Sequence, residues 1–290
     1  MLRNCSELMH AAQMKRTVLI LVFLKLCTSF SFAQSSKGYR LVWADEFNYT
    51  GAPDPSKWNC QTGFLRNYEP QWYQAENARV SGGFLTITAK KEKRVNPNFD
   101  RQSKNWKINR SSAPYTSASL STKGKFDFRY GKVQMRAKID IAKGMWPAFW
   151  MLGTKQVTWP ANGEVDIMEY FRGNLHANAV WAGKNGEAWS IKKVPTSSLG
   201  GEAWAKEFHT WEMIWDESKI IISVDNQKLS TIDLSQTINH KTKENPFHNR
   251  FYLLVNLAMG QKWEKVPDSS LPSKFILDYI RVYQKRKQGS

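Results

Sequence analysis

Short runs in which apolar and polar residues alternate recur along most of the chain. The clearest are rich in β-branched and aromatic residues, which favour strands, and they cover residues 83–89, 132–139, 219–224, 227–233, 251–257 and 274–283. Asp225 and Asn226 separate two of these runs and are typical of a tight hairpin turn. No convincing amphipathic helix of about 12 residues interrupts them. The pattern therefore predicts an all-β protein built as an antiparallel β-sandwich.

One segment, residues 95–114, breaks this rhythm. It is polar and basic, and its large apolar residues are Phe99, Trp106 and Ile108. A stretch of this length without strand or helix signals predicts a long surface loop, which we place beside a cleft.

The N-terminal residues have the pattern of an export signal. Residues 14–33 begin with basic residues, continue with an apolar run broken only by Lys25, and end in Ser-Phe-Ala, a small-residue cleavage site. The run is too short for a membrane span, which needs about 20 apolar residues. Cys27 suggests a lipid anchor, but Lys25 does not fit the small residues that precede such a site. We predict an upstream extension in residues 1–13, a true start at Met14, and a secreted protein, periplasmic or extracellular, whose residues 34–290 form one domain.

Composition and charge narrow the class of partner. The chain is 41% apolar and 23% charged, as in ordinary globular proteins. Its net charge is +17, and removing residues 1–33, which hold four basic residues and one acidic residue, leaves +14. The Lys and Arg residues are scattered and no nucleic-acid motif accompanies them, so a solvated basic surface or an acidic polysaccharide partner remains. The same removal leaves Cys60 as the only cysteine, which excludes a disulfide framework. We expect the protein to be a monomer.

The most unusual strand pattern lies at residues 162–170, which read NGEVDIMEY. Glu164 and Asp166 would point to the same face of a strand, whereas Glu169 would fall on the opposite face by strict alternation. A one-residue bulge near Ile167 and Met168 would return Glu169 to the first face. The sequence thus predicts three acids on the wet, concave side of the sheet and apolar residues on its core side.

Three neighbouring acids cannot all ionise easily, so their pKa values should be driven apart. Hydrolysis of a glycosidic bond uses this arrangement, because one carboxylate attacks the anomeric carbon while a second carboxyl still holds a proton for the leaving oxygen. A metal site and a solvated acidic strand are the alternatives. The tryptophans that flank the strand, Trp146, Trp150 and Trp159, favour the sugar chemistry.

The motif Glu-x-Asp-x-x-Glu at residues 164–169 resembles glycoside hydrolase family 16 in its bulged, laminarinase-like form. Further segments match that family in order, namely residues 41–47, 67–73, 115–138, 145–152, 208–216, 251–260 and 277–284. The resemblance implies a jelly-roll sandwich with a concave substrate cleft, and endo-acting cleavage with retention of configuration. It also implies that Glu164 is the nucleophile and Glu169 the general acid/base, and that Asp166 tunes the nucleophile.

Sugar-binding residues follow from the same resemblance. The turn Arg66-Asn67-x-Glu69 matches a family turn whose polar side chains contact sugar hydroxyls. Aromatic rings suit the apolar face of a pyranose, which makes candidates of Trp72, Trp146, Trp150 and Trp159, with Trp150 the one expected to be structural. After the catalytic strand, laminarinases carry His-Gly-x-x-His. Here His176 matches the first histidine, but Val180 or Trp181 stands at the second, and Trp181 offers a different ring.

These departures leave the substrate open. β-1,3- or mixed-linkage β-glucan leads, and β-linked galactans of the agar, porphyran, carrageenan or mucin-like type follow closely. In the second case Arg101, Lys104, Lys107 and Arg110 of the long loop would attract an anionic chain. Transglycosylation ranks third, and a noncatalytic sugar-binding protein is disfavoured because both catalytic glutamates are present.

No cofactor is required for this chemistry. The resemblance implies a structural Ca²⁺ on the convex face, for which Glu46 and Asp278 fit by position, since calcium prefers oxygen ligands. Asp278 fits an ordinary edge-strand residue equally well.

Overall fold

The computed structural model describes residues 38–262 and 264–286. Nearly all of them lie in one compact unit, Leu41–Ser290. The predicted upstream extension and export signal, residues 1–33, fall outside the described residues. No helix in the described part of the chain combines the length and apolar character needed to cross a membrane.

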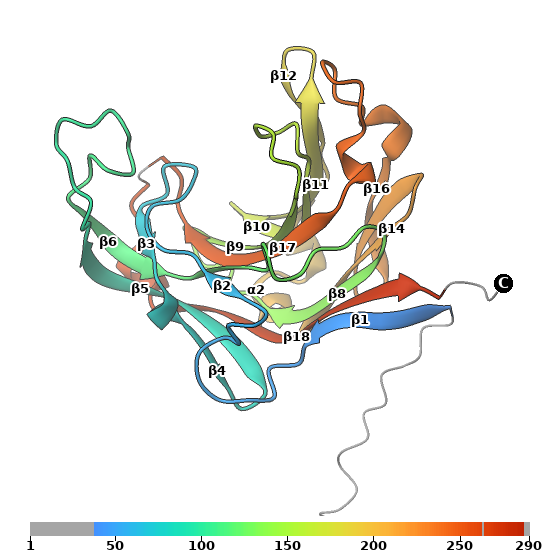
Figure 1. The fold of residues 1–290 in the computed structure, drawn as a ribbon. Helices are drawn as coiled ribbons and strands as arrows, with labels where there is room; N and C mark the ends of the chain where they lie inside the picture. Colours follow the sequence, from blue (N-terminus) through green and yellow to red (C-terminus); the bar gives the residue numbers. More distant parts are fainter. Residues whose placement is uncertain (1–37, 263, 287–290) are drawn as a thin grey trace, which may run out of the picture. The chain divides into compact units, whose positions relative to one another are not determined.

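Two sheets make up the sandwich (Figure 1). The outer sheet has, in order, β16 (Gln227–Asp233), β15 (Lys219–Val224), β14 (His209–Trp215), β8 (Gly131–Lys138), β18 (Ser273–Lys285), β5 (Phe84–Val95), β6 (Ser112–Ser117) and β3 (Gln71–Tyr73), with β1 (Tyr39–Asp45) beside β18 and β4 (Ala78–Ser81) beside β5. The cleft sheet has β12 (Gly186–Ser190), β11 (Asn174–Gly183), β10 (Glu164–Phe171), β9 (Met145–Gly153), β17 (Phe251–Met259), β7 (Ser119–Ser121) and β2 (Asn59–Cys60), with β13 (Lys193–Pro195) beside β11.

Helices are short, as the sequence pattern predicts. The described residues contain the α-helix α2 (Gly201–Ala205) and the 3₁₀ turns η1 (Ala75–Asn77), η2 (Thr196–Leu199), η3 (Leu234–Gln236), η4 (Pro246–His248) and η5 (Asp268–Ser270). The neighbouring strands from β16 to β6 in the outer sheet and from β12 to β2 in the cleft sheet run antiparallel, whereas β3 and β6 run parallel. The predicted all-β antiparallel sandwich is therefore confirmed, with that one exception.

Most of the strands lie where the alternation places them, and β5 differs for a physical reason. The sequence pattern ends this strand at residue 89, whereas in the structure it continues to Val95. The extension forms because β6 pairs with the polar second half of the strand and supplies backbone partners there. The hairpin at Asp225 and Asn226 is confirmed, since both residues have the left-handed φ values (47° and 64°) that a tight hairpin turn requires.

The core lies between the two sheets. Alternate residues of β8 and β14, such as Met135 and Trp211, are fully buried there. The central strands β9 and β17 are buried on both faces. On the face away from the core, Trp150, Tyr252 and Leu254 pack together with Ala148 as a second apolar layer. This layer forms the floor on which the concave site is built.

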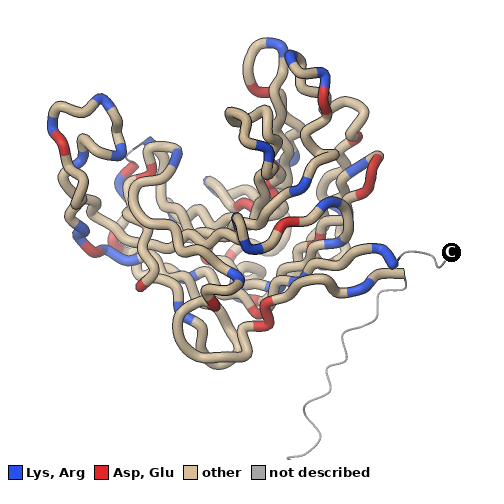
Figure 2. The backbone as a smooth tube through the Cα atoms, in the orientation of Figure 1, with Lys and Arg blue, Asp and Glu red and all other residues tan. Residues whose placement is uncertain are grey.

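Charge does not gather on one element. Figure 2 shows Lys and Arg spread along both sheets and their loops, with Asp and Glu between them. The scattered distribution expected from the sequence is seen throughout the described residues.

Candidate active site

A β-bulge in β10 brings the three acids together. Glu164 and Asp166 pair in regular register with β9, and the register then shifts by one residue before Met168 and Glu169. Ile167 and Met168 are both fully buried, so two successive side chains enter the core. The predicted bulge is confirmed, and it returns Glu169 to the same face as the other two acids.

The glycine before Glu164 has a specific reason to be there. Gly163 has a φ of 78°, and a Cβ at this position would lie 2.9 Å from Cβ of Pro246 and 3.0 Å from the ring of Phe251. A side chain would therefore clash as well as strain the backbone. Glycine lets β10 start close against η4 and aims Glu164 at the cleft.

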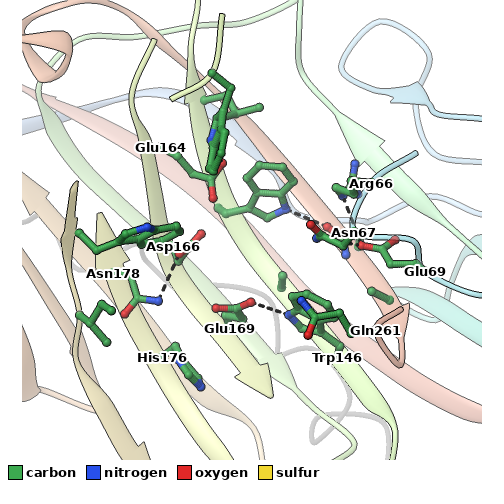
Figure 3. A pocket seen from close by; sticks show the side chains of 18 of the residues that line it. Arg66, Asn67, Glu69, Trp146, Glu164, Asp166, Glu169, His176, Asn178 and Gln261 are labelled. Atoms are coloured by element: carbon green, nitrogen blue, oxygen red, sulfur yellow. Dashed lines mark hydrogen bonds and ion pairs between the residues drawn. The ribbon is translucent and has the colours of Figure 1, made fainter. Parts of the chain in front are cut away.

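The acids line an open pocket of about 740 Å³ on the concave face. Figure 3 shows Glu164, Asp166 and Glu169 side by side on the pocket wall, with Arg66 and Asn67 on the opposite side.

Each of the two glutamates accepts a hydrogen bond from an indole. Trp159 Nε1 donates to Glu164 Oε2 at 2.9 Å, and Trp146 Nε1 donates to Glu169 Oε1 at 2.5 Å. An indole N–H can only donate, so it occupies one carboxyl oxygen with a lone pair facing it. This favours a proton on the other oxygen of each carboxyl. The two tryptophans thus hold both carboxyl groups in position.

Burial sets the protonation of the three acids. It raises the pKa of Glu164 to about 7, where the charge of Glu169 also raises it and the Trp159 bond and Arg66 oppose the rise. Burial likewise raises the pKa of Glu169 to about 7, against the Trp146 bond and Lys193.

The pKa of Asp166 lies well above its usual range, because the group is buried and faces the charges of Glu164 and Glu169. The acids interact strongly, so their protons leave in steps that belong to the group. Near neutral pH the site can hold an ionised and a protonated carboxyl together.

Asn178 lies on the neighbouring strand β11 and forms a hydrogen bond with the middle acid of β10. It lies directly opposite Asp166, and its Nδ2 donates to Asp166 Oδ2 at 3.4 Å while its Oδ1 accepts the backbone N–H of Lys192 at 3.1 Å. No motif in the sequence pointed to Asn178. Alternation from His176 would have found it, since residues two apart share a face of a strand.

Comparison with known proteins decides between the alternatives left open for this strand. The sequence model for glycosyl hydrolases family 16 matches residues 64–279, which include the whole acidic strand. The chain belongs to glycoside hydrolase family 16. It is a glycoside hydrolase, in line with the sugar chemistry expected for residues 164–169.

Relatives and solved structures agree with the family. The chain is 34% identical over 294 residues to the beta-glucanase of Rhodothermus marinus, covering 93% of this chain and 95% of that protein. A solved structure from work on endo-acting O-glycanases with which human gut microbiota initiate mucin breakdown has a TM-score of 0.80 and 34% identity over 87% of this chain and 93% of that one. A non-specific endo-beta-1,3(4)-glucanase from family GH16 has a TM-score of 0.70 and 34% identity over 86% and 92%.

In this family 16 enzyme the Arg66 turn forms a polar wall of the pocket. Glu69 is buried and accepts hydrogen bonds from Tyr73 Oη at 2.9 Å, Gln71 Nε2 at 2.8 Å and Asn67 Nδ2 at 3.2 Å. Its burial raises its pKa. Glu69 therefore anchors the turn from within, and the more accessible Arg66 and Asn67 present their polar groups to the cleft.

Arg66 is itself held by several contacts. Its guanidinium lies 5.3 Å from the ring centre of Tyr73 and 5.1 Å from that of Trp150, and its Nη2 donates to Ser119 Oγ at 2.8 Å. Trp150 in turn donates its indole N–H to Asn256 Oδ1 at 2.7 Å. Trp150 is thus part of the pocket floor and a support for Arg66, in line with the expected structural role.

Two predicted sugar platforms do not reach the pocket. Trp72 is 4% exposed and packs edge-on against Phe64 at 5.3 Å, beneath the Arg66 turn. Trp181 lies on the core side of β11, with its ring 6.5 Å from that of Phe247. The reason is the parity of the strand, because Trp181 is an odd number of residues from His176 and points to the other face.

His176 does line the pocket, opposite Glu169 in the β10–β11 pairing. Burial lowers its pKa, and the charge of Lys193 lowers it further. Its ring is therefore neutral around pH 7 and can both donate and accept a hydrogen bond. Val180, at the expected place of the second histidine, is fully buried.

The hairpin of β11 and β12 and the following strand add cleft residues that the sequence did not reveal. They are Glu187, Trp189, Ile191 and Lys193. Trp189 donates its indole N–H to Glu187 Oε2 at 3.0 Å, and its ring lies edge-on to Trp159 at 6.4 Å. These two exposed indoles form an aromatic wall on the nucleophile side of the cleft.

The four cations expected to face an anionic chain do not line the pocket. They are Arg101, Lys104, Lys107 and Arg110, and all belong to the loop between β5 and β6. The guanidinium of Arg110 lies over the ring of Phe64 at 4.3 Å instead. Arg66 and Lys193 are the cations that the described pocket wall presents.

The two acids assigned to calcium are each engaged by an arginine. Glu46 accepts two hydrogen bonds from Arg281, both at 2.7 Å, and Asp278 accepts one from Arg136 at 2.5 Å. Among the described residues no group of three or more His, Cys, Asp or Glu side chains is arranged to hold a metal ion. Both carboxylates are thus charge-paired with arginine, and no step of the chemistry is assigned to a cation.

The indole bonds lead to a prediction for the pH dependence. In Trp146→Phe the ring stays but the N–H that stabilises ionised Glu169 is lost, so the pKa of Glu169 rises. A general acid works while protonated, and the basic limb of the kcat/KM profile should move up by about one pH unit.

Trp159→Phe is the matched control. Loss of its N–H raises the pKa of Glu164, which has to be ionised in its expected role as nucleophile, so here the acidic limb should move up. The measurement is kcat/KM against pH for both variants and wild type. Profiles in which neither limb moves, or in which both variants move the same limb, contradict these roles.

Proposed function

We propose that this family 16 enzyme is a secreted endo-hydrolase that cuts internal β-linkages of a polysaccharide with retention of configuration. The observation that carries the proposal is the bulged strand itself. It places Glu164 and Glu169 on one face of an open cleft, each held by one indole and each with a pKa of about 7.

The geometry supports a double displacement. Ionised Glu164 attacks the anomeric carbon, while Glu169 gives its proton to the oxygen of the departing chain, and a covalent glycosyl ester forms. Glu169, now ionised, takes a proton from water, which attacks the same carbon and releases Glu164. Protonated Asp166 adds no third charge beside the nucleophile and can donate a hydrogen bond to it.

β-1,3- or mixed-linkage β-glucan is the leading substrate. The beta-glucanase of Rhodothermus marinus matches the chain over almost the full length of both proteins. The exposed indoles of Trp159 and Trp189 suit the apolar faces of glucose rings.

A galactan or mucin-type glycan is the second candidate, and one observation favours it. At the same 34% identity, the O-glycanase structure superposes with a TM-score of 0.80 and the glucanase with 0.70. Lys193, exposed on the pocket wall near His176, would also suit an anionic substituent.

One experiment tests the reaction and ranks these substrates. Laminarin, lichenan, agarose, porphyran, carrageenan and mucin glycans are digested, with product lengths read by mass spectrometry and early anomers by proton NMR. We expect the β-anomer first and long chains shortened before small sugars accumulate. Early α-anomer, or release of monosaccharide alone, would overturn the proposal.

The affinity for an anionic chain should fall with added salt, whereas the affinity for laminarin should not change.

A further inference from the structure

The polar turn beside the pocket presents one aromatic ring away from it. Arg66, Asn67 and Glu69 line the pocket, and Tyr68 between them is 46% exposed. Asn67 and Tyr68 both adopt left-handed backbone conformations, with φ of 57° and 53°, which is uncommon for residues other than glycine and costly for a tyrosine. Such conformations persist where the surroundings hold them, and they cluster at functional positions.

The surroundings of this turn are well defined. The backbone N–H of Glu69 donates to the carbonyl of Arg66 at 3.1 Å, and the carbonyl of Asn67 accepts the N–H of Lys262 at 3.3 Å. The carboxylate of Glu69 is anchored from within by the hydrogen bonds described above. The turn that carries Tyr68 is therefore held in place by these hydrogen bonds.

A second ring reaches Tyr68 from the long loop between β5 and β6. The ring centres of Tyr68 and Trp106 lie 4.8 Å apart, and the two rings are tilted by 31° to each other. Behind them, Phe64 lies 6.1 Å from Trp106 and 5.3 Å from the buried Trp72. Tyr68 and Trp106, which we call the aromatic shelf, thus rest on a buried apolar cluster.

The loop that carries Trp106 is fastened to the same turn. Arg110 stacks on Phe64 and its Nη1 donates to the carbonyl of Glu69 at 3.3 Å. Within the loop, Nδ2 of the buried Asn96 donates to the carbonyls of Lys107 and Arg110, at 3.0 and 2.8 Å. In Figure 1 this loop and the segment before β3 rise side by side, across the cleft sheet from β12. The shelf thus adjoins Asn67 of the pocket wall and lies on the side of the cleft sheet opposite β12.

We propose that the aromatic shelf is a distal subsite that binds one pyranose ring of the polysaccharide, away from the linkage that is cut. An internal cut requires the chain to leave the pocket at both ends, and Tyr68 follows directly after Asn67 of the pocket wall without lining the pocket itself. A β-linked pyranose offers a flat C–H face that packs on an aromatic ring. Because the two rings already contact each other and pack against Phe64, little ordering is required when the sugar binds. This subsite rests on the proposed polysaccharide substrate.

The test compares long and short substrates of one sugar type. Tyr68→Asn removes the ring and keeps a residue that tolerates the left-handed backbone, and Trp106→Leu removes the second ring with less change of volume. Phe99→Ala, in the same loop and 43% exposed, is the matched control. KM and kcat are measured on whichever of laminarin and purified mucin glycans the wild type degrades, and on an aryl trisaccharide of the same sugars.

Tyr68→Asn and Trp106→Leu should raise KM for the long chain about fivefold, with kcat and the short substrate unchanged. Phe99→Ala should match the wild type on both. Equal effects on long and short substrates, or no effect of either shelf variant, would overturn the subsite while leaving the proposed reaction intact.

Binding without turnover is measured by affinity electrophoresis, in which a gel that contains laminarin or mucin glycans slows a protein that binds them. The shelf variants should migrate faster than the wild type in the gel that retards it. A wild type that neither gel retards would refute the shelf, and a wild type that is retarded but degrades no polysaccharide would refute the proposed reaction alone.

Discussion

Glu164→Ala should abolish turnover, with kcat lower by about four orders of magnitude or more, because no covalent intermediate can form without the nucleophile. The measurement is the steady-state rate on the best polysaccharide of the panel. Added azide gives a second readout. It can enter the space left by the carboxylate and attack the anomeric carbon directly, and one displacement at a β-linkage yields an α-glycosyl azide.

Folding of this variant can be checked separately. Burial raises the pKa of Glu164 in the folded protein, so the carboxyl costs stability once the pH rises above its unfolded value near 4.3. Removing it should leave Tm at pH 8 equal to or above that of the wild type. A folded Glu164→Ala enzyme with near-normal turnover would show that another group is the nucleophile.

Glu169→Ala should slow hydrolysis by about two to four orders of magnitude on polysaccharide, because the departing sugar oxygen leaves without a proton. On an aryl glycoside with a good leaving group the first step needs no acid, and the covalent intermediate should accumulate. Azide then attacks the intermediate and restores part of the rate. Two displacements give a β-glycosyl azide, the opposite anomer to that expected from Glu164→Ala.

The two azide products discriminate between the roles more strictly than the two rates. NMR of the products from both variants is the decisive measurement. If Glu169→Ala gave the α-azide, or if azide failed to accelerate it on any leaving group, the acid/base assignment would have to be exchanged or withdrawn. Glu187→Gln, a change in a cleft carboxyl that accepts the indole N–H of Trp189, is the control and should need no azide.

The catalytic strand could be predicted because its constraints are local. Glu164, Asp166 and Glu169 can share a wet face only through a bulge between them, and apolar Ile167 and Met168 have to turn inward. Alternation also placed the strands and the Asp225–Asn226 hairpin. These features depend on the two-residue alternation of a strand and on the residue types that a turn requires. Both can be recognised from residues that are neighbours in the sequence.

The rest of the cleft depends on which distant segments meet. Trp72 is buried because Phe64 and Ala113, which belong to other segments, pack against it. The residues next to Trp72 in the sequence do not predict this burial. Lys193 and Trp189 enter the cleft because β13 and β12 both pair with β11. The arginines that engage Glu46 and Asp278 come from β18 and β8, far away along the chain. Trp181 is different, since its parity relative to His176 could have excluded it from the cleft.

The bulge in β10 has a consequence for how this strand can change in evolution. A deletion within a strand usually inverts every side chain beyond it, and selection removes it. Here a loss of Ile167 or Met168 would remove the bulge instead and leave the three acids at regular alternate positions on one face. The catalytic strand can therefore exist in two lengths with its chemistry preserved, whereas a deletion at Val165 would turn Glu164 toward the core. Lineages that share this fold can differ by one residue here and still cut the same bond.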